Sequence, residues 1–122
     1  MNTMFIGQNG RINFLCQLQT KTTIMKELKR DEMMEWILDV LTDENNDRIF
    51  VGTSEDFNGS TNGIHLSGES MDEYKGEVIY DYYSENHIDR EFGVLKKWEK
   101  ELNKRGWYSE WYDAGTISLH TL

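Results

Sequence analysis

Acid–base chemistry is the first possibility to consider, because 22 of the 122 residues are Asp or Glu. Glu77 and Asp81 lie four residues apart in a segment typical of a β-strand, which would place their Cα atoms about 13 Å apart at roughly 3.3 Å per residue. That separation is too large for a catalytic carboxylate pair. Either acid could pair with one from another strand, such as Glu110, and His65 or His120 could join them. A small enzyme or small-molecule-binding domain with a carboxylate-lined pocket is therefore one alternative.

Metal binding has little support in the sequence. Asp43, Asn45 and Asp47 have the alternating oxygen ligands that open a calcium loop. The loop then fails, because Arg48 stands where it needs Gly and Ser54 where it needs a bidentate Glu. The single cysteine and the three dispersed histidines provide no ligand pair at zinc-finger or metalloprotease spacing. We predict no metal ion and no other cofactor.

Nucleophilic catalysis would need a reactive thiol or an activated serine. Cys16 alternates in phase with Ile12, Phe14 and Leu18, which predicts a buried and unreactive thiol. No Gly-x-Ser-x-Gly motif occurs, and the small residues of segment 59–63 include no lysine, so this segment does not match a Walker loop. We therefore predict no catalytic residue and favour a non-enzymatic function.

The negative charge is concentrated in two segments of the chain. The net charge is −9; residues 31–56 carry nine acids against Arg48 alone, and residues 69–91 carry eight acids against Lys75 and Arg90. The uncharged segment 57–68 separates them. A protein that binds nucleic acid directly needs an excess of Lys and Arg to meet the phosphates, so this class is excluded. A basic protein partner would instead be attracted.

These acidic segments are the strongest candidates for a binding surface. Glu35, Asp39 and Asp43 follow at helical spacing and line one face of the predicted first helix. The second segment mixes acids with tyrosines, which contribute much of the binding energy at interfaces. The alternative is that the acids only solvate the surface and that Tyr80 and Tyr82 belong to the core. We predict the following partner-binding residues: Glu35, Asp39, Asp43, Asp72, Glu73, Glu77, Asp81, Tyr83 and Glu85.

In general type, a short acidic chain without catalytic signatures resembles the stoichiometric inhibitors that bacteria and phages make, although no specific family motif occurs. We expect a small acidic, non-enzymatic inhibitor that blocks a basic nucleic-acid-handling protein, of the anti-CRISPR or anti-restriction type, with carboxylates that imitate DNA phosphates. Tyr83 and an exposed aromatic residue of the last hairpin would anchor it, and Trp36 is either a further anchor or the edge of the core. The alternatives are an immunity protein against a nuclease or other bacterial toxin, and a subunit of a larger complex.

The elements that must position these residues follow from hydrophobic periodicity and turn signals. We predict one α+β domain over residues 1–122, with a mainly antiparallel sheet built from hairpins and two helices packed on it. The helices run from Asp31 to about Thr42 and from a cap at Asp89 to Gly106. A hairpin spans 4–19, a loop spans 55–63, and the last hairpin turns at Asp113-Ala114-Gly115 with Gly115 in the left-handed region. The remaining strands are 48–53, 64–67, 76–83, 107–112 and 116–122.

The sequence also predicts a compartment. No apolar run approaches the 18 or so residues of a membrane span, and the first residues lack the apolar segment of a signal peptide. The single Cys16 cannot form an internal disulfide, which is typical of a reducing environment. We expect a cytoplasmic protein.

Overall fold

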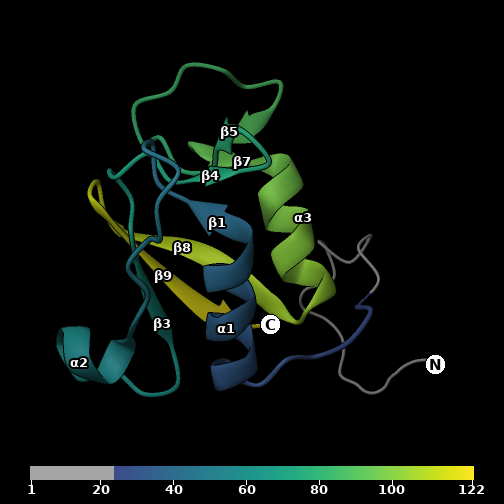
Figure 1. Cartoon of the computed structure of the whole chain (residues 1–122), viewed down its shortest axis with the longest axis vertical. Helices are drawn as coiled ribbons and strands as arrows, with labels where there is room; N and C mark the ends of the chain where they lie inside the picture. The colour runs from purple at the N-terminus through teal and green to yellow at the C-terminus, as the bar shows by residue number, and fades with distance from the viewer. Residues whose placement is uncertain (1–23) are drawn as a thin grey trace.

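Four antiparallel strands form the main sheet of the protein (Figure 1). The computed structural model describes residues 24–122, so the predicted hairpin over 4–19, with Cys16, lies outside the described residues. Across the sheet, β2 (Gly52–Thr53) is followed by β3 (Ile64–Ser67), β9 (Thr116–Thr121) and β8 (Trp107–Asp113). Every pairing is antiparallel, and the predicted α+β class built from hairpins is confirmed.

Two helices cover one face of this sheet. In Figure 1, α1 (Arg30–Val40) lies in front of the strands and α3 (Lys96–Lys104) lies beside α1. Buried side chains alternate along β3 and β9, as expected for strands with one face packed against helices. None of the helices in residues 24–122 is long and apolar enough to cross a membrane.

Trp36 joins the two helices. Its ring stacks on Trp98 of α3 with centroids 5.4 Å apart, and the guanidinium of Arg105 lies 3.9 Å from the centroid of the Trp36 ring. Trp98 is fully buried, whereas Trp36 is partly buried against the same core. Trp36 therefore forms the edge of the core.

Two smaller sheets and a short helix complete the described fold. The first sheet has the order β1 (Leu41–Thr42), β4 (Glu73–Tyr74), β5 (Glu77–Val78), and the second is the hairpin of β6 (Arg90–Glu91) and β7 (Val94–Leu95). The short helix α2 (Ser54–Asn58) lies in the segment predicted to be a loop. It forms because the Thr53 hydroxyl accepts a hydrogen bond from the backbone N–H of Asp56.

Two predicted elements are shorter than expected. The first helix ends at Val40 because the next two residues, Leu41 and Thr42, pair with β4. Its N-cap is Lys29, whose backbone N–H donates to the Glu32 carboxylate at 3.0 Å, so the cap predicted at Asp31 is wrong by two residues. The predicted strand 48–53 is reduced to β2, since only its last two residues pair with β3.

The predicted strand 76–83 is wrong beyond β5. The alternation placed Tyr80 on one face and Ile79 on the other, but these consecutive residues are both buried. The backbone of Ile79 accepts from Leu95 N–H at 2.8 Å, and Tyr80 bridges to Val94. Ile79 and Tyr80 thus pair with the β6–β7 hairpin and not with a longer neighbouring strand. After Tyr80 the chain turns, and Tyr82 is exposed.

The second helix begins later than its predicted cap at Asp89. The residues after Asp89 form the β6–β7 hairpin, and α3 starts only at Lys96. Phe92 and Gly93, with φ of 51° and 78°, make the two-residue turn of this hairpin. The helix ends as predicted, with Gly106 in the left-handed region at φ 85°.

The last hairpin is confirmed as β8 and β9. Its turn differs in detail, because Gly115 does not have a positive φ. A register shift between Trp111 and Asp113 accommodates the extra residue as a bulge.

A chain of buried and partly buried hydrogen bonds links α3 to the main sheet. The indole N–H of Trp98 on α3 donates to the Tyr80 hydroxyl at 2.8 Å, and this hydroxyl lies 2.8 Å from Ser109 Oγ on β8. Ser109 in turn donates its backbone N–H to the carboxylate of Glu99 at 3.0 Å. Burial raises the pKa of Tyr80, so the hydroxyl stays protonated.

We expect Tyr80→Phe to destabilise the protein by about 1–3 kcal/mol, because it leaves the buried indole N–H of Trp98 without an acceptor. Urea denaturation measures the change. The matched control is Tyr83→Phe, which removes the same hydroxyl from a ring that is 80% exposed and should leave the free energy of unfolding nearly unchanged. Equal stability of the two variants would contradict the role assigned to the Tyr80 hydroxyl.

Candidate functional site

The two acidic segments meet where β1 pairs with β4. Thr42 lies opposite Glu73, so Asp43 and Asp72 are neighbours across the strands. Asp72 is only 5% exposed and accepts a hydrogen bond from Ser70 Oγ at 2.9 Å. Burial raises the pKa of the Asp72 carboxyl, and the nearby charge of Asp43 acts in the same direction. Of the predicted partner-binding acids, Asp72 thus offers a partner little surface.

Asp43 closes a turn at the end of β1. Its carboxylate accepts the backbone N–H groups of Asn45 at 2.8 Å and Asp47 at 2.9 Å. The first residue of the segment that opens like a calcium loop therefore binds the local backbone. Within residues 24–122, no group of three or more His, Cys, Asp or Glu side chains is arranged to hold a metal ion.

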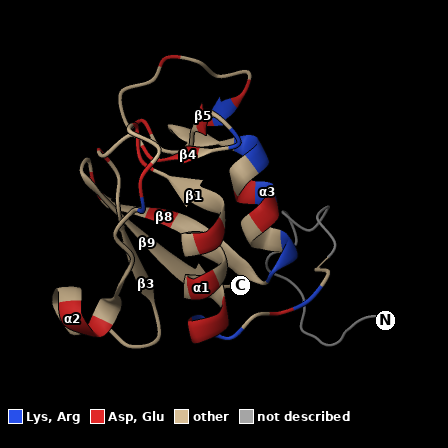
Figure 2. Cartoon of the chain, viewed as in Figure 1, with Lys and Arg blue, Asp and Glu red and all other residues tan. Residues whose placement is uncertain are grey.

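Other predicted acids lie at exposed or half-buried positions of a helix and a strand. Glu35 and Asp39 are exposed on α1, and Figure 2 shows acidic residues along this helix and on α2, whereas Lys and Arg gather at the ends of α3. Glu73 is half-buried in β4. The described part of the molecule therefore has an acidic side around α1 and a more basic side around α3.

Two of the three carboxylates considered for acid–base chemistry have a basic partner. Glu77 lies 2.9 Å from Lys97 Nζ, and Glu110 lies 3.2 Å from His120 Nε2. Asp81 is half-buried, and its backbone N–H donates to the Gly93 carbonyl at 2.8 Å. The structure thus pairs Glu77 with a cation from α3 and Glu110 with a neighbour on β9.

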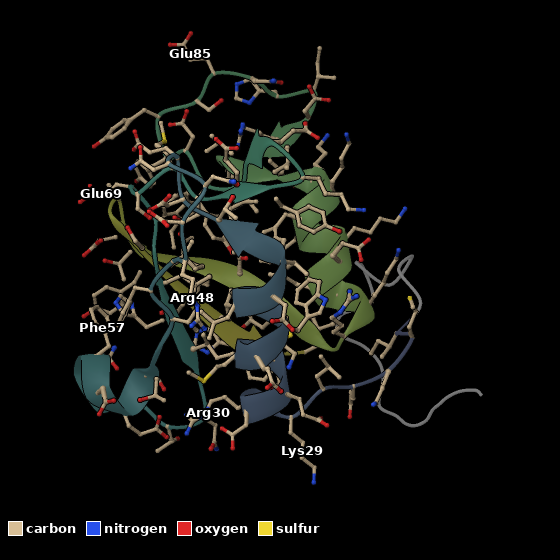
Figure 3. The ribbon with its side chains drawn as sticks, in the orientation of Figure 1. Lys29, Arg30, Arg48, Phe57, Glu69 and Glu85 are labelled. Atoms are coloured by element: carbon tan, nitrogen blue, oxygen red, sulfur yellow. The ribbon has the colours of Figure 1, made fainter. Side chains whose placement is uncertain are left out.

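The loop over residues 82–92, which we call the aromatic loop, exposes several large apolar side chains. Tyr83 is 80% exposed, Ile88 82% and Phe92 83%, and the predicted contact residue Glu85 is exposed between them. Glu85 lies at one extreme of the molecule, far from Phe57 of α2 (Figure 3). The predicted contacts Tyr83 and Glu85 therefore share a protruding loop rather than a face with α1.

Phe92 occupies the most unusual position in this loop. Its φ of 51° lies in the left-handed region, where a bulky side chain costs roughly 1–2 kcal/mol. The turn is held firmly: Trp111 Nε1 donates to the Phe92 carbonyl at 2.7 Å, and a Cβ on Gly93 would lie 2.4 Å from the Asp81 carbonyl oxygen. The backbone thus holds the exposed Phe92 in one place.

Sequence reasoning missed Phe92. Turns with two positive φ values usually carry Asn-Gly or Asp-Gly, and Phe-Gly does not match that signal. The cap assigned to Asp89 also placed Phe92 inside a helix. Only Gly93, followed by the apolar pair Val94 and Leu95, could have indicated a hairpin.

A hollow of about 400 Å³ lies beside the edge strand β2. Its walls include Met34 of α1, Phe50, Phe57 of α2 and His65 of β3, and Asp56 is the carboxylate at its lining. Burial lowers the pKa of His65, while the charge of Asp113 acts in the opposite direction. The pocket envisaged from the sequence would contain several carboxylates, whereas this hollow has one carboxylate beside the three aromatic rings of Phe50, Phe57 and His65.

Comparison with known proteins adds no relative. No family model, no curated protein and no solved structure matches the chain. Function must therefore be argued from the described residues themselves.

We expect the effect of Asp72→Asn on the free energy of unfolding to be more favourable at pH 7 than at pH 3.5. Because the folded state raises the pKa of Asp72 above its usual 3.8, the favourable contribution of the protonated carboxyl is complete below that value. It is lost as the pH rises through the folded-state pKa, and the amide variant avoids this loss. The free energy of unfolding of the variant minus that of the wild type should therefore increase with pH.

Urea denaturation at both pH values measures this difference. Other titrating groups contribute equally to both proteins and cancel. Glu85→Gln, at an exposed loop position, is the control for removing one acid. If this difference stays constant or decreases with pH, ionisation of Asp72 does not destabilise the folded protein.

Proposed function

We propose that this protein is a non-catalytic binding protein that blocks a basic nucleic-acid-handling protein, with the aromatic loop as its main contact. The observation that carries the proposal is Phe92, a large apolar side chain that is 83% exposed at a strained turn position. Strained backbone is retained mainly where function requires it. Phe92 does not pack in the described core, so its cost to folding has no compensating gain there.

The anchoring of the loop supports this interpretation. A loop whose backbone is already fixed loses less entropy on binding, and aromatic anchors contribute much of the energy at interfaces. The Phe92 turn is tied to β8 through Trp111, and Tyr82 packs edge-on to the same indole with ring centroids 5.0 Å apart. Tyr83 then packs edge-on to Tyr82 at 5.3 Å. The loop thus presents Tyr83 and Phe92 on a fixed base.

The charge around the loop favours a basic partner. Glu85, Asp89 and Glu91 are exposed within it, against Arg90 as its one Lys or Arg residue. The negative potential of these acids speeds association with a positively charged surface and repels nucleic acid. A protein that occupies the phosphate-binding surface of a nuclease or another nucleic-acid-handling enzyme would block it without chemistry of its own.

We expect Phe92→Asn to separate folding from binding. Asn tolerates the left-handed region, so the variant should be as stable as the wild type or more stable, by up to about 1 kcal/mol. Loss of the anchor should weaken partner binding by roughly tenfold or more. Urea denaturation gives the stability, and capture from a bacterial lysate at low salt, followed by titration of the purified captured protein, gives the affinity.

A second variant tests the charge. Glu85→Lys with Glu91→Lys should weaken binding and flatten its dependence on salt. Glu110→Lys, on β8, is the control for charge reversal away from the loop. The proposal requires a captured protein that binds nucleic acid and is released by salt, and whose DNA or RNA binding the wild type competes away. Capture of no such protein, or equal capture by the Phe92→Asn variant, would refute it.

A further inference from the structure

The hollow beside β2 has aromatic walls. His65 stacks on Phe57 with ring centroids 4.1 Å apart and an interplanar angle of 11°, and Phe50 meets His65 edge-on at 5.8 Å. Phe57 also meets Tyr112 of β8 edge-on at 5.1 Å. Phe50 is nevertheless 65% exposed, so much of its ring contacts no other described residue.

Gly52 leaves space for this arrangement. A Cβ on Gly52 would lie 2.8 Å from Cζ of Phe50 and 3.7 Å from Cδ2 of His65. Because this position has no side chain, the Phe50 ring can lie directly over the backbone of the edge strand β2. The ring is therefore held at the hollow by the chain beneath it and remains open on its outer side.

The charges at the hollow have one sign. Asp56 contributes a carboxylate to the lining, and within the described residues its side chain forms no ion pair. The neighbouring Glu55 is already engaged: the backbone N–H of Asn62 and the guanidinium of Arg30 lower its pKa to about 2. No Lys or Arg belongs to the lining, and the lowered pKa of His65 leaves that imidazole neutral at pH 7.

We propose that this hollow binds a guanidinium group, the head group of an arginine side chain. Aromatic faces attract cations, and arginine makes such contacts more often than lysine because its planar group stacks on a ring. The planar guanidinium group can also direct two N–H donors to one carboxylate, and Asp56 provides this carboxylate. A neutral aromatic ligand would satisfy the apolar walls and leave Asp56 without a partner.

The volume is consistent with this ligand. About 400 Å³ is near the lower end for small-molecule sites, which accommodates one side chain better than a large cofactor. The site lies apart from the aromatic loop (Figure 3), and it does not depend on the function proposed above.

Nitrogen–proton correlation NMR on the full chain tests the proposal, with N-acetyl-arginine methylamide as the probe. We expect shifts confined to the amides of residues 50–57 and 65. The citrulline analogue has the same shape without the charge, and its dissociation constant should be about tenfold higher. The lysine analogue, which is a cation without a planar guanidinium group, should also bind more weakly than the arginine probe.

Two variants assign the contacts. Phe50→Leu keeps an apolar side chain at an exposed position and removes the ring face, so it should weaken arginine binding several-fold; Phe92→Leu is the matched control and should not. Asp56→Asn should weaken arginine binding more than citrulline binding, because only arginine carries a positive charge that the carboxylate attracts. Backbone spectra of each variant verify that the fold is retained.

Three results would overturn the proposal: no shifts at the solubility limit of the arginine probe, shifts located elsewhere, or equal binding of arginine and citrulline. Because the probe is a small molecule and the readout is local, a failure here leaves the proposed partner binding of the aromatic loop intact. Conversely, failure to capture a basic partner would not affect the result at the hollow.

Discussion

The hydrogen-bonded chain from Trp98 through Tyr80 to Ser109 is the interaction on which the rest of the described structure depends. It joins α3, the segment before the aromatic loop and β8, with Trp98 and Tyr80 buried and Ser109 half-buried. Unpaired polar atoms at buried positions are costly, so the three elements must approach in one arrangement. The aromatic loop begins two residues after Tyr80, and Trp111 holds its far end two residues after Ser109. The position of the exposed Phe92 is therefore set from within the core.

The same arrangement explains why sequence analysis succeeded in some regions and failed in others. Strand β3 and hairpin β8–β9 were predicted because their alternation reflects one buried face against helices. Segment 76–83 has the same alternation, yet its pairing is decided by Leu95, which binds the backbone of Ile79 from sixteen residues away. Local periodicity does not include such a contact, so both the strand and the helix start at Asp89 were mispredicted.

Candidate binding residues show a similar division. The exposure of Glu35, Asp39, Tyr83 and Glu85 agrees with what their residue types suggest. The burial of Asp72 and the ion pair between Glu77 and Lys97 follow from strand pairing and helix placement, which spacing along the chain does not reveal. Of the hollow beside β2, sequence analysis named only His65 as a pocket residue, because Phe50, Phe57 and His65 are brought together by the pairing of β2 with β3 and by the unexpected helix α2.

The contact between Glu99 and Ser109 has a consequence for how this protein can associate. Strand β8 forms an outer margin of the main sheet, and an open margin offers N–H and carbonyl groups to any passing strand. Here α3 lies along it: Glu99 accepts the Ser109 N–H, and Asn103 donates to the Trp107 carbonyl at 2.9 Å. At the other margin β2 is two residues long and leads straight into α2. The start of β8 and the short β2 thus leave few open backbone groups for a further strand, which favours recognition through side chains.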